Sequence, residues 1–149
     1  MRADIARLRQ EYSHHSLLEK DIVSNPIEQF SLWWDQVLKA EITEPNAMTL
    51  ATASSDGMPT ARVVLLKGFD ENGFSFYTNY NSYKAKQMEE NPKACLIFFW
   101  KELERQVRII GLIEKLPDKD NDEYFNSRPE GSRIGAWTSP QSEVIENRE

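Results

Sequence analysis

Cysteine is almost absent from this chain of 149 residues, since Cys95 is its only one. A lone cysteine cannot form a disulfide within the chain, so the sequence predicts a protein of a reducing compartment, the cytoplasm. Long hydrophobic runs are missing too. The longest, Cys95–Trp100, is far shorter than the about 20 residues that cross a bilayer. No signal peptide pattern opens the chain. We therefore expect a soluble protein with no membrane contact.

Positive charge is in deficit. Eighteen Lys and Arg residues face 24 Asp and Glu residues, which gives a formal net charge of −6. Broad nucleic-acid binding needs a basic face that displaces counterions, so the sequence argues against a nucleic-acid partner. A few local cations could still hold one small anion.

Several catalytic signatures are lacking. The chain has no Gly-rich phosphate loop and no GxSxG motif, which argues against a Rossmann-type nicotinamide site and a serine hydrolase. His14 and His15 are adjacent, with no spaced carboxylates or thiols to complete a metal site, so no metal is expected. Nothing near Cys95 activates it as a nucleophile.

The N-terminal part predicts helices. Residues 2–12 favour a short polar helix and residues 13–24 a connector, so we divide the chain into 1–24 and a domain over 25–149. Asn25 is a predicted N-cap, with Pro26 at the first helical position. A broad apolar face follows, and we interpret it as core. It contains Ile27, Phe30, Trp33, Trp34, Val37 and Leu38.

From residue 47 the pattern changes to strands joined by turns such as Asp56-Gly57 and Asn72-Gly73. Sequential hairpins favour an antiparallel sheet, which avoids open edges best by closing. The predicted fold is mainly β, an antiparallel β-barrel with peripheral α-helices. We expect strands at 47–53, 60–67, 74–79, 93–100 and 104–116, helices at 82–91 and 118–127, the second of them ended by Pro129, and an extended piece at 132–137.

Arg62 and Lys67 stand at the ends of the apolar run RVVLLK. They could reach phosphates at a rim, or could simply extend to water from a core strand. Strand alternation puts them on opposite faces, so a shared site needs a bulge, a strand end or a ligand with atoms on two sides.

Other polar groups lie further along. Thr78 and Lys84 flank a helix N-terminus, where free N–H groups favour an anion, although a solvated lysine is as good an explanation. Gln106 could contact a polar ring edge or merely be exposed. Arg128 offers a planar fork for phosphate, beside the hydroxyls of Tyr124 and Ser132, and a surface ion pair is the alternative.

The order of these groups is more specific than any one of them. Near the start, the chain contains the segments LRQEY and NPIEQFSLWWDQ. Four longer segments follow in this order: ARVVLLKGFDENGFSFYTNYNS, YKAKQMEENP, FFWKELERQVRIIGLIEKL and YFNSRPEGSRIGAWTSPQS. Across nearly its whole length the chain resembles the pyridoxamine 5'-phosphate oxidase family. The segments RVVLLK, LERQV and SRP-x-x-S-x-IGAW are the most specific.

The resemblance implies a homodimeric FMN-binding split barrel with FMN at the subunit interface. By resemblance, FMN would contact Arg62, Val63, Val64, Leu65, Leu66, Lys67, Tyr77, Thr78, Lys84, Gln106, Gln141 and Ser142. The substrate phosphate would contact Lys67, Tyr124, Arg128 and Ser132, and a secondary product site would lie at Arg9, Gln10, Glu11 and Tyr12.

The implied reaction oxidises C4' of pyridoxamine or pyridoxine 5'-phosphate to give pyridoxal 5'-phosphate. Hydride passes to the flavin, and oxygen reoxidises the flavin to yield hydrogen peroxide. No side chain is a compelling general base, so no catalytic residue is assigned.

Two features depart from the family. Tyr83 replaces its usual Arg, and the family continues past Glu149 by roughly a third of its length. The family's tail adds sheet, dimer contacts, and residues at flavin and substrate. Two alternatives to an oxidase follow: a non-catalytic module that binds flavin or pyridoxal phosphate, and a structural subunit completed by a second chain.

Overall fold

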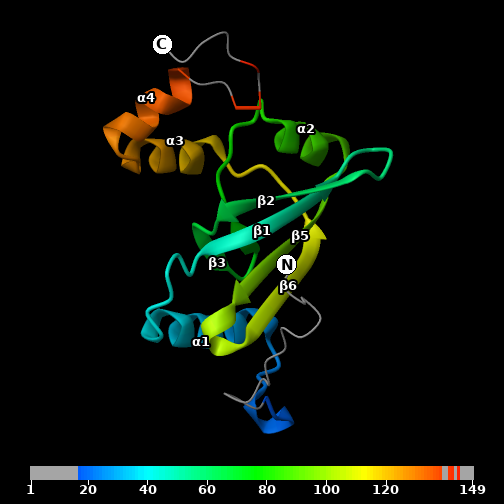
Figure 1. The fold of residues 1–149 in the computed structure, drawn as a ribbon, viewed down its shortest axis with the longest axis vertical. Coiled ribbons are helices and arrows are strands. Elements are labelled where there is room, and N and C mark those ends of the chain that lie inside the picture. Colours follow the sequence, from blue (N-terminus) through cyan, green and yellow to red (C-terminus); the bar gives the residue numbers. More distant parts are fainter. Residues whose placement is uncertain (1–16, 139–140, 143, 145–149) are drawn as a thin grey trace, which may run out of the picture. The chain divides into compact units, whose positions relative to one another are not determined.

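The structure is a computed structural model that describes residues 17–138, 141–142 and 144 (Figure 1). The chain divides into two compact units. The first comprises the chain up to Pro45 together with Phe99–Gln106, and the second comprises Asn46–Phe98 and the chain from Val107. The predicted boundary after residue 24 stays a prediction.

The first unit is organised by helix α1 (Pro26–Lys39), which follows a short 3-10 helix, η2 (Glu19–Asp21). The predicted cap is confirmed, because Asn25 Oδ1 accepts hydrogen bonds from the backbone N–H groups of Ile27 and Glu28 at 2.8 and 3.4 Å. Two residues of the predicted apolar face, Phe30 and Val37, are buried, whereas Leu38 is exposed, so its placement in the core was wrong.

Aromatic packing makes the core of this unit. The ring of Trp100 lies 5.9 Å from that of Phe30 and 6.2 Å from that of Trp34. The indole Nε1 of Trp100 donates to the carbonyl oxygen of Pro45 at 2.9 Å, which satisfies the polar end of a buried side chain.

Four strands form one sheet in the order β2-β1-β5-β6. Strand β1 pairs antiparallel with β2 and with β5, and Leu50 of β1 lies opposite Arg62 of β2. Met48, Leu50 and Thr52 of β1 alternate with less buried residues, as a half-buried strand requires. The bounds are β1 Ala47–Ala53, β2 Pro59–Leu65, β5 Lys93–Trp100 and β6 Arg105–Leu112, with the 3-10 helix η3 (Lys101–Leu103) between β5 and β6.

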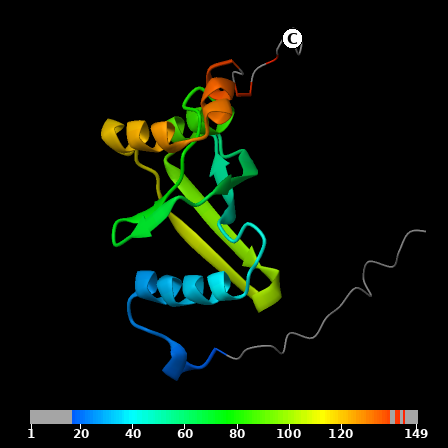
Figure 2. The same cartoon turned by 90° about the vertical axis from the view of Figure 1, so that its left-hand side faces the viewer.

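A separate two-stranded sheet contains β3 (Gly68–Asp70) and β4 (Gly73–Ser75) (Figure 2). The hairpin predicted from Asn72-Gly73 is confirmed, but its turn residues are Glu71 and Asn72, and Gly73, whose φ of +142° favours glycine, begins β4 opposite Asp70. The prediction of antiparallel sheets with peripheral helices is confirmed. The barrel is not, because β2 and β6 stay at the edges of an open sheet within the described residues.

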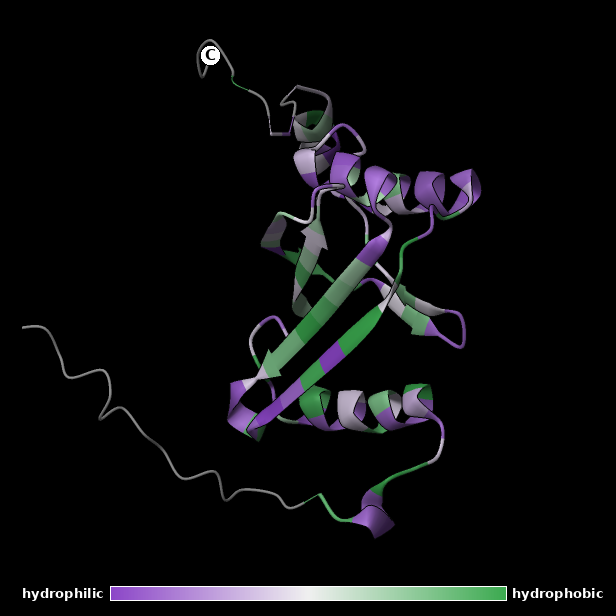
Figure 3. Ribbon diagram, turned by 90° about the vertical axis from the view of Figure 1, so that its right-hand side faces the viewer, coloured by the Kyte–Doolittle hydropathy of each residue, from purple (hydrophilic) through white to green (hydrophobic). Residues whose placement is uncertain are grey.

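Three further helices belong to the second unit: α2 (Tyr83–Glu90), α3 (Asp118–Ser127) and α4 (Glu130–Thr138). Ser82 caps α2, since its Oγ accepts from Ala85 N at 3.4 Å. Figure 3 colours most of α3 as hydrophilic. The described part of the chain has no helix that is long and apolar enough to cross a membrane.

The extended piece predicted at 132–137 is wrong, because these residues lie in α4. Pro129 was interpreted as the end of helical structure. Its carbonyl oxygen instead accepts from Ser132 N at 2.9 Å and from Arg133 N at 3.1 Å, and thereby starts a new helix. The proline ring ends the helix before it and does not prevent one after it.

Strand β2 ends at Leu65, earlier than predicted. Beyond it, Leu66 N donates to the carbonyl oxygen of Asn46 at 2.8 Å and Lys67 N donates to that of Ser75 at 2.9 Å. Lys67 therefore pairs with the end of the β3–β4 hairpin and no longer follows the alternation of β2. The strand between 74 and 79 is shorter than predicted as well, and ends at Ser75.

Candidate functional site

Four polar residues of β1, β2 and α2 form a cluster that we call the Arg62 cluster: Arg62 and Thr60, which are half-buried, and Thr52 and Gln87, which are buried. One terminal nitrogen of Arg62, Nη1, donates to Thr52 Oγ1 at 2.7 Å and to the carbonyl oxygen of Leu50 at 3.2 Å. The other, Nη2, donates to Thr60 Oγ1 and, at 3.5 Å, to Gln87 Oε1. These four neutral acceptors use the four N–H groups of the terminal nitrogens, which leaves Nε–H for a ligand. Burial lowers the pKa of Arg62.

Lys84 lies in the first turn of α2, and three side-chain oxygens surround its ammonium group. Its Nζ donates to Thr78 Oγ1 at 3.1 Å, to Ser82 Oγ at 3.4 Å and to Gln141 Oε1 at 2.8 Å. The pKa of Lys84 is lowered from its ordinary value of 10.5, first by burial and second by the charge of Arg62. The two cations are thus close enough to repel each other.

Among the described residues, no carboxylate neutralises this pair. Within the described residues neither Arg62 nor Lys84 forms an ion pair, and no Asp or Glu contributes to the pKa of either group; the Tyr83 phenol, a much weaker acid, slightly opposes the lowering of the pKa of Arg62. Two half-buried like charges are costly together unless an anion binds between them. The arrangement therefore favours a negatively charged ligand. The N–H groups at the start of α2 add to the same preference.

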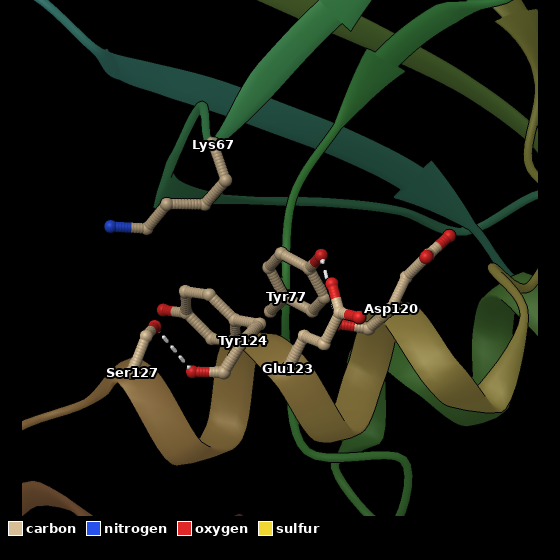
Figure 4. A pocket seen from close by; sticks show the side chains of 6 residues that line it. All are labelled: Lys67, Tyr77, Asp120, Glu123, Tyr124 and Ser127. Atoms are coloured by element: carbon tan, nitrogen blue, oxygen red, sulfur yellow. Dashed lines mark hydrogen bonds between the residues drawn. The ribbon is translucent and has the colours of Figure 1, made fainter.

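A second site lies at α3, and we call it the tyrosine pocket. It has a volume of about 360 Å³. Figure 4 shows the rings of Tyr77 and Tyr124 stacked face to face, with the Lys67 side chain reaching over Tyr124. The ring centroids are 3.7 Å apart, and Lys67 Nζ lies 5.7 Å from the Tyr124 centroid. The lining residues are Lys67, Tyr77, Asp120, Glu123, Tyr124 and Ser127.

Tyr77 is fixed at its phenol end, because its hydroxyl donates to the carbonyl oxygen of Asp120 at 3.4 Å. Burial, and then the negative charge of Asp120, raise the pKa of Tyr77, so the phenol stays protonated. Ser127 Oγ donates to the carbonyl oxygen of Tyr124 at 2.7 Å, near the C-terminus of α3. The pocket combines one cation, two aromatic rings and two carboxylates.

The structure brings together two groups of predicted residues. Arg62 is near Lys84, which contacts Thr78 and Gln141, whereas Lys67 and Tyr77 meet Tyr124 in the tyrosine pocket. Strand β2 ends before Lys67, so strand alternation does not apply to Lys67, and the structure places Lys67 and Arg62 in different groups.

Other predicted residues lie apart from these contacts. Arg128 sits over the ring of Phe125 at 5.9 Å and does not line the tyrosine pocket, nor does Ser132, which is exposed on α4. Gln106 is exposed on β6 and belongs to the first unit. In the run after Arg62, Val63 and Leu65 are exposed, Val64 is half-buried and Leu66 is buried; Ser142 is exposed, with φ of +68°. Arg9, Gln10, Glu11 and Tyr12 lie outside the described residues.

Sequence reasoning missed three members of the Arg62 cluster: Thr52, Thr60 and Gln87. A signal was present, because Thr52 stands at the inward position that follows Met48 and Leu50 in strict alternation. A polar residue at a core position predicts a buried partner. Asp120, Glu123 and Ser127 were also missed as pocket residues, and an acidic, polar helix such as α3 gives no sign of which face lines a site.

Comparisons with known proteins identify the family of the chain. Residues 34–149 match the family described as pyridoxamine 5'-phosphate oxidase. A pyridoxine/pyridoxamine 5'-phosphate oxidase of Nostoc punctiforme is 56% identical over 145 residues, which cover 97% of this chain and 68% of that protein. The protein of the same name from Salinibacter ruber is 55% identical over 144 residues, covering 97% and 67%.

Solved structures show the same fold. PhzG of Burkholderia lata, solved in complex with tetrahydrophenazine-1-carboxylic acid, has a TM-score of 0.85 and 30% identity, and the match covers 89% of this chain and 67% of PhzG. A pyridoxamine 5'-phosphate oxidase-related FMN-binding protein of Nostoc punctiforme has a TM-score of 0.59 at 19% identity, covering 72% of this chain and 62% of that one. By sequence and by fold, the chain belongs to the pyridoxamine 5'-phosphate oxidase family.

Proposed function

We propose that this chain carries the flavin site of an oxidase that converts pyridoxamine or pyridoxine 5'-phosphate to pyridoxal 5'-phosphate, using FMN and oxygen and releasing hydrogen peroxide. Family membership supports the reaction class. The observation that carries the assignment of a site is the pair Arg62 and Lys84, two half-buried cations that no carboxylate of the described residues neutralises.

The residues present fit the phosphate of FMN. Arg62 and Lys84 supply charge, and Thr78 and Ser82 supply hydroxyl groups next to Lys84. Gln141 Oε1 also contacts Lys84. A phosphate group has several acceptor oxygens, so donors from several directions can be satisfied at once. The donor set therefore suits a phosphate monoester better than a neutral ligand.

The tyrosine pocket is the proposed place of the substrate. FMN, when bound, supplies the two-electron oxidation at C4'. The chain's own contribution is to hold the substrate phosphate away from the reacting carbon, so that binding energy becomes alignment. We assign Lys67, Tyr124, Arg128 and Ser132 to that phosphate. Lys67 lies over Tyr124 already, whereas Arg128 and Ser132 would contact the phosphate only after moving relative to Tyr124.

We further propose a homodimer built as a split barrel, with FMN between the subunits. Within the second unit, the edge strands expose large apolar side chains: Val63 of β2 is 67% exposed, and Ile110 and Leu112 of β6 are 73% and 71% exposed. Unpaired strand edges with apolar side chains favour association. A second copy of the chain is the partner expected to cover them.

The proposal is tested with the purified chain in two stages. Its visible absorption spectrum with added FMN, and its mass by light scattering, show whether a flavin-loaded dimer forms. Pyridoxine 5'-phosphate and oxygen are then added, and pyridoxal 5'-phosphate and peroxide are measured. A flavin-loaded dimer without turnover would reject the oxidase for this chain and leave the flavin site standing. A colourless protein at saturating FMN would reject both.

A further inference from the structure

Gln87 is the most buried long polar side chain of the Arg62 cluster. It lies on α2 and is 2% exposed. Its carbonyl oxygen, Oε1, accepts from Thr52 Oγ1 at 2.7 Å, from Thr60 Oγ1 at 2.6 Å and from Arg62 Nη2 at 3.5 Å. Three donors from two strands therefore converge on one atom of a helix.

The two threonines act as relays. A hydroxyl group has a single hydrogen to donate, and both Thr52 and Thr60 direct theirs at Gln87. Their lone pairs are then left for Arg62, whose two terminal nitrogens donate one to each hydroxyl. Gln87 thus sets the direction of both hydroxyl groups, and the hydroxyl groups set the plane of the guanidinium.

Packing alone does not account for a glutamine here. Its Nε2 is buried and has no hydrogen-bond partner among the described residues. A buried donor without a partner is destabilising, and a methionine of similar length would fill the same space without one. The polarity of this side chain is therefore explained by the oxygen that faces Arg62.

We propose that Gln87 is a positioning residue for the phosphate of FMN: through Thr52 and Thr60 it fixes Arg62 in the orientation in which Arg62 and Lys84 bind the same anion. This inference rests on the proposed function for the identity of the anion. Gln87 itself does not contact the phosphate, because its oxygen is occupied by the threonines and Arg62.

Two substitutions of Gln87 test separately the loss of its acceptor oxygen and the addition of a negative charge at the same place. Gln87→Met removes the acceptor, so both hydroxyl groups are free to turn and Arg62 loses its fixed plane. Gln87→Glu keeps the acceptor and adds a negative charge beside Arg62, which competes with the phosphate. Gln29→Met is the matched control, since Gln29 is also buried but accepts from Val23 N in the first unit.

The experiment measures dissociation constants for FMN and for riboflavin, which lacks the phosphate, by flavin fluorescence. Gln87→Met is expected to weaken FMN binding about tenfold and to leave riboflavin binding unchanged. Gln87→Glu is expected to weaken FMN binding at neutral pH and to regain it as the pH falls and the new carboxyl group takes up a proton. Gln29→Met should bind both flavins as the unaltered chain does.

Equal FMN affinity in Gln87→Met and the unaltered chain would overturn the inference. A loss of riboflavin affinity as large as the loss of FMN affinity would overturn it too, because it would indicate a structural role. If Gln87→Met does not fold, Thr60→Val breaks one relay and should weaken FMN binding about threefold, with riboflavin unchanged. If the unaltered chain binds no FMN, the proposed function fails separately. The NMR signals of the Arg62 guanidinium then test Gln87 alone, and an unchanged spectrum in Gln87→Met would overturn its role.

Discussion

Around Arg62 the polar side chains are buried or half-buried and form hydrogen bonds with one another, whereas around Tyr124 the described polar side chains line an open pocket and form fewer such bonds. Both regions belong to the second unit. The guanidinium of Arg62 is held by two threonines and a main-chain carbonyl before any ligand binds. In the tyrosine pocket two rings stack on each other at 3.7 Å, which leaves no room for a ligand ring between them.

This difference indicates a division between a preformed anion site and an adaptable aromatic one. Preformed donors cost little reorganisation when the ligand arrives, and tight retention is what a cofactor needs. A pocket whose rings must part or accept a ligand on an outer face suits a molecule that enters and leaves at each turnover. Substitutions in the two regions should therefore affect different ligands.

The largest effect is expected from Arg62→Ala. It removes the charge and leaves Thr52, Thr60 and Gln87 without their shared donor. FMN binding should fall by about 100-fold, because the positive charge beside the phosphate and the charge-assisted hydrogen bond from Nε–H are both lost. Flavin fluorescence titration measures this. Lys93→Ala removes an exposed cation from β5 and should have no effect; an FMN affinity in Arg62→Ala equal to that control would contradict the anion site.

Arg128→Ala should affect the other ligand. We expect the KM for pyridoxine 5'-phosphate to rise by about 10- to 100-fold, or roughly 1.5–3 kcal/mol, while FMN affinity stays constant. Steady-state kinetics on flavin-saturated protein measure the first quantity. Lys93→Ala, at an exposed position on β5, is the control for loss of positive charge. Unchanged kinetics in an active preparation would remove Arg128 from the substrate site.

Lys84 gives a pH test of the anion site. Because its pKa is lowered by burial and by Arg62, Lys84 loses its proton at a lower pH than an ordinary lysine, whose pKa is 10.5. The contribution of Lys84 to FMN binding should therefore be complete at neutral pH and be lost as the pH rises, before 10.5 is reached.

Two variants check this. Lys84→Ala should bind FMN about tenfold more weakly at neutral pH. Lys84→Arg should keep binding at alkaline pH, where the unaltered chain loses it, because an arginine stays charged there. Titrations across the pH range compare the three proteins. Identical pH profiles for the unaltered chain and Lys84→Arg would show that Lys84 does not bear the charge that matters.

The smallest effect is expected from Tyr83→Arg, which introduces the cation that the family usually has. Tyr83 is 54% exposed, so the added charge is screened by solvent. FMN binding should improve by about threefold, whereas the protein without ligand should become slightly less stable because a third cation joins Arg62 and Lys84. Calorimetry with and without FMN measures both. If the Tyr83→Arg variant without ligand were more stable than the unaltered chain, the expected repulsion between the new cation and the pair Arg62 and Lys84 would be contradicted.

The elements that sequence predicted well are those with strong local signals. Strand β1, strand β5 and helix α3 begin and end where the alternation, the apolar run and Pro129 placed them. Helix α4 was missed because a proline that ends one helix can start another, and the local pattern does not separate the two cases.

The site was predicted less completely than the fold. The sequence predicted Arg62, Lys84 and Tyr124 as site residues, because they are cations or hydroxyl groups within segments that follow one another in the order of the family. Gln87 was not, because its role depends on which face of α2 meets β1 and β2, and no local pattern in the sequence states that. The relation of Lys67 to Arg62 likewise needed the observed end of β2, since alternation alone placed them on opposite faces.

Because pairing of β2 stops at Leu65, the chain can be lengthened on either side of that point with opposite results. An extra residue within β2 before Arg62 would shift the register and turn the guanidinium to the solvent side of the sheet. An extra residue after Leu65 would leave Arg62 in place and move only the ammonium group of Lys67. The position of Arg62, proposed to bind FMN, and that of Lys67, proposed to bind the substrate phosphate, can therefore change independently, even though only a few residues separate them.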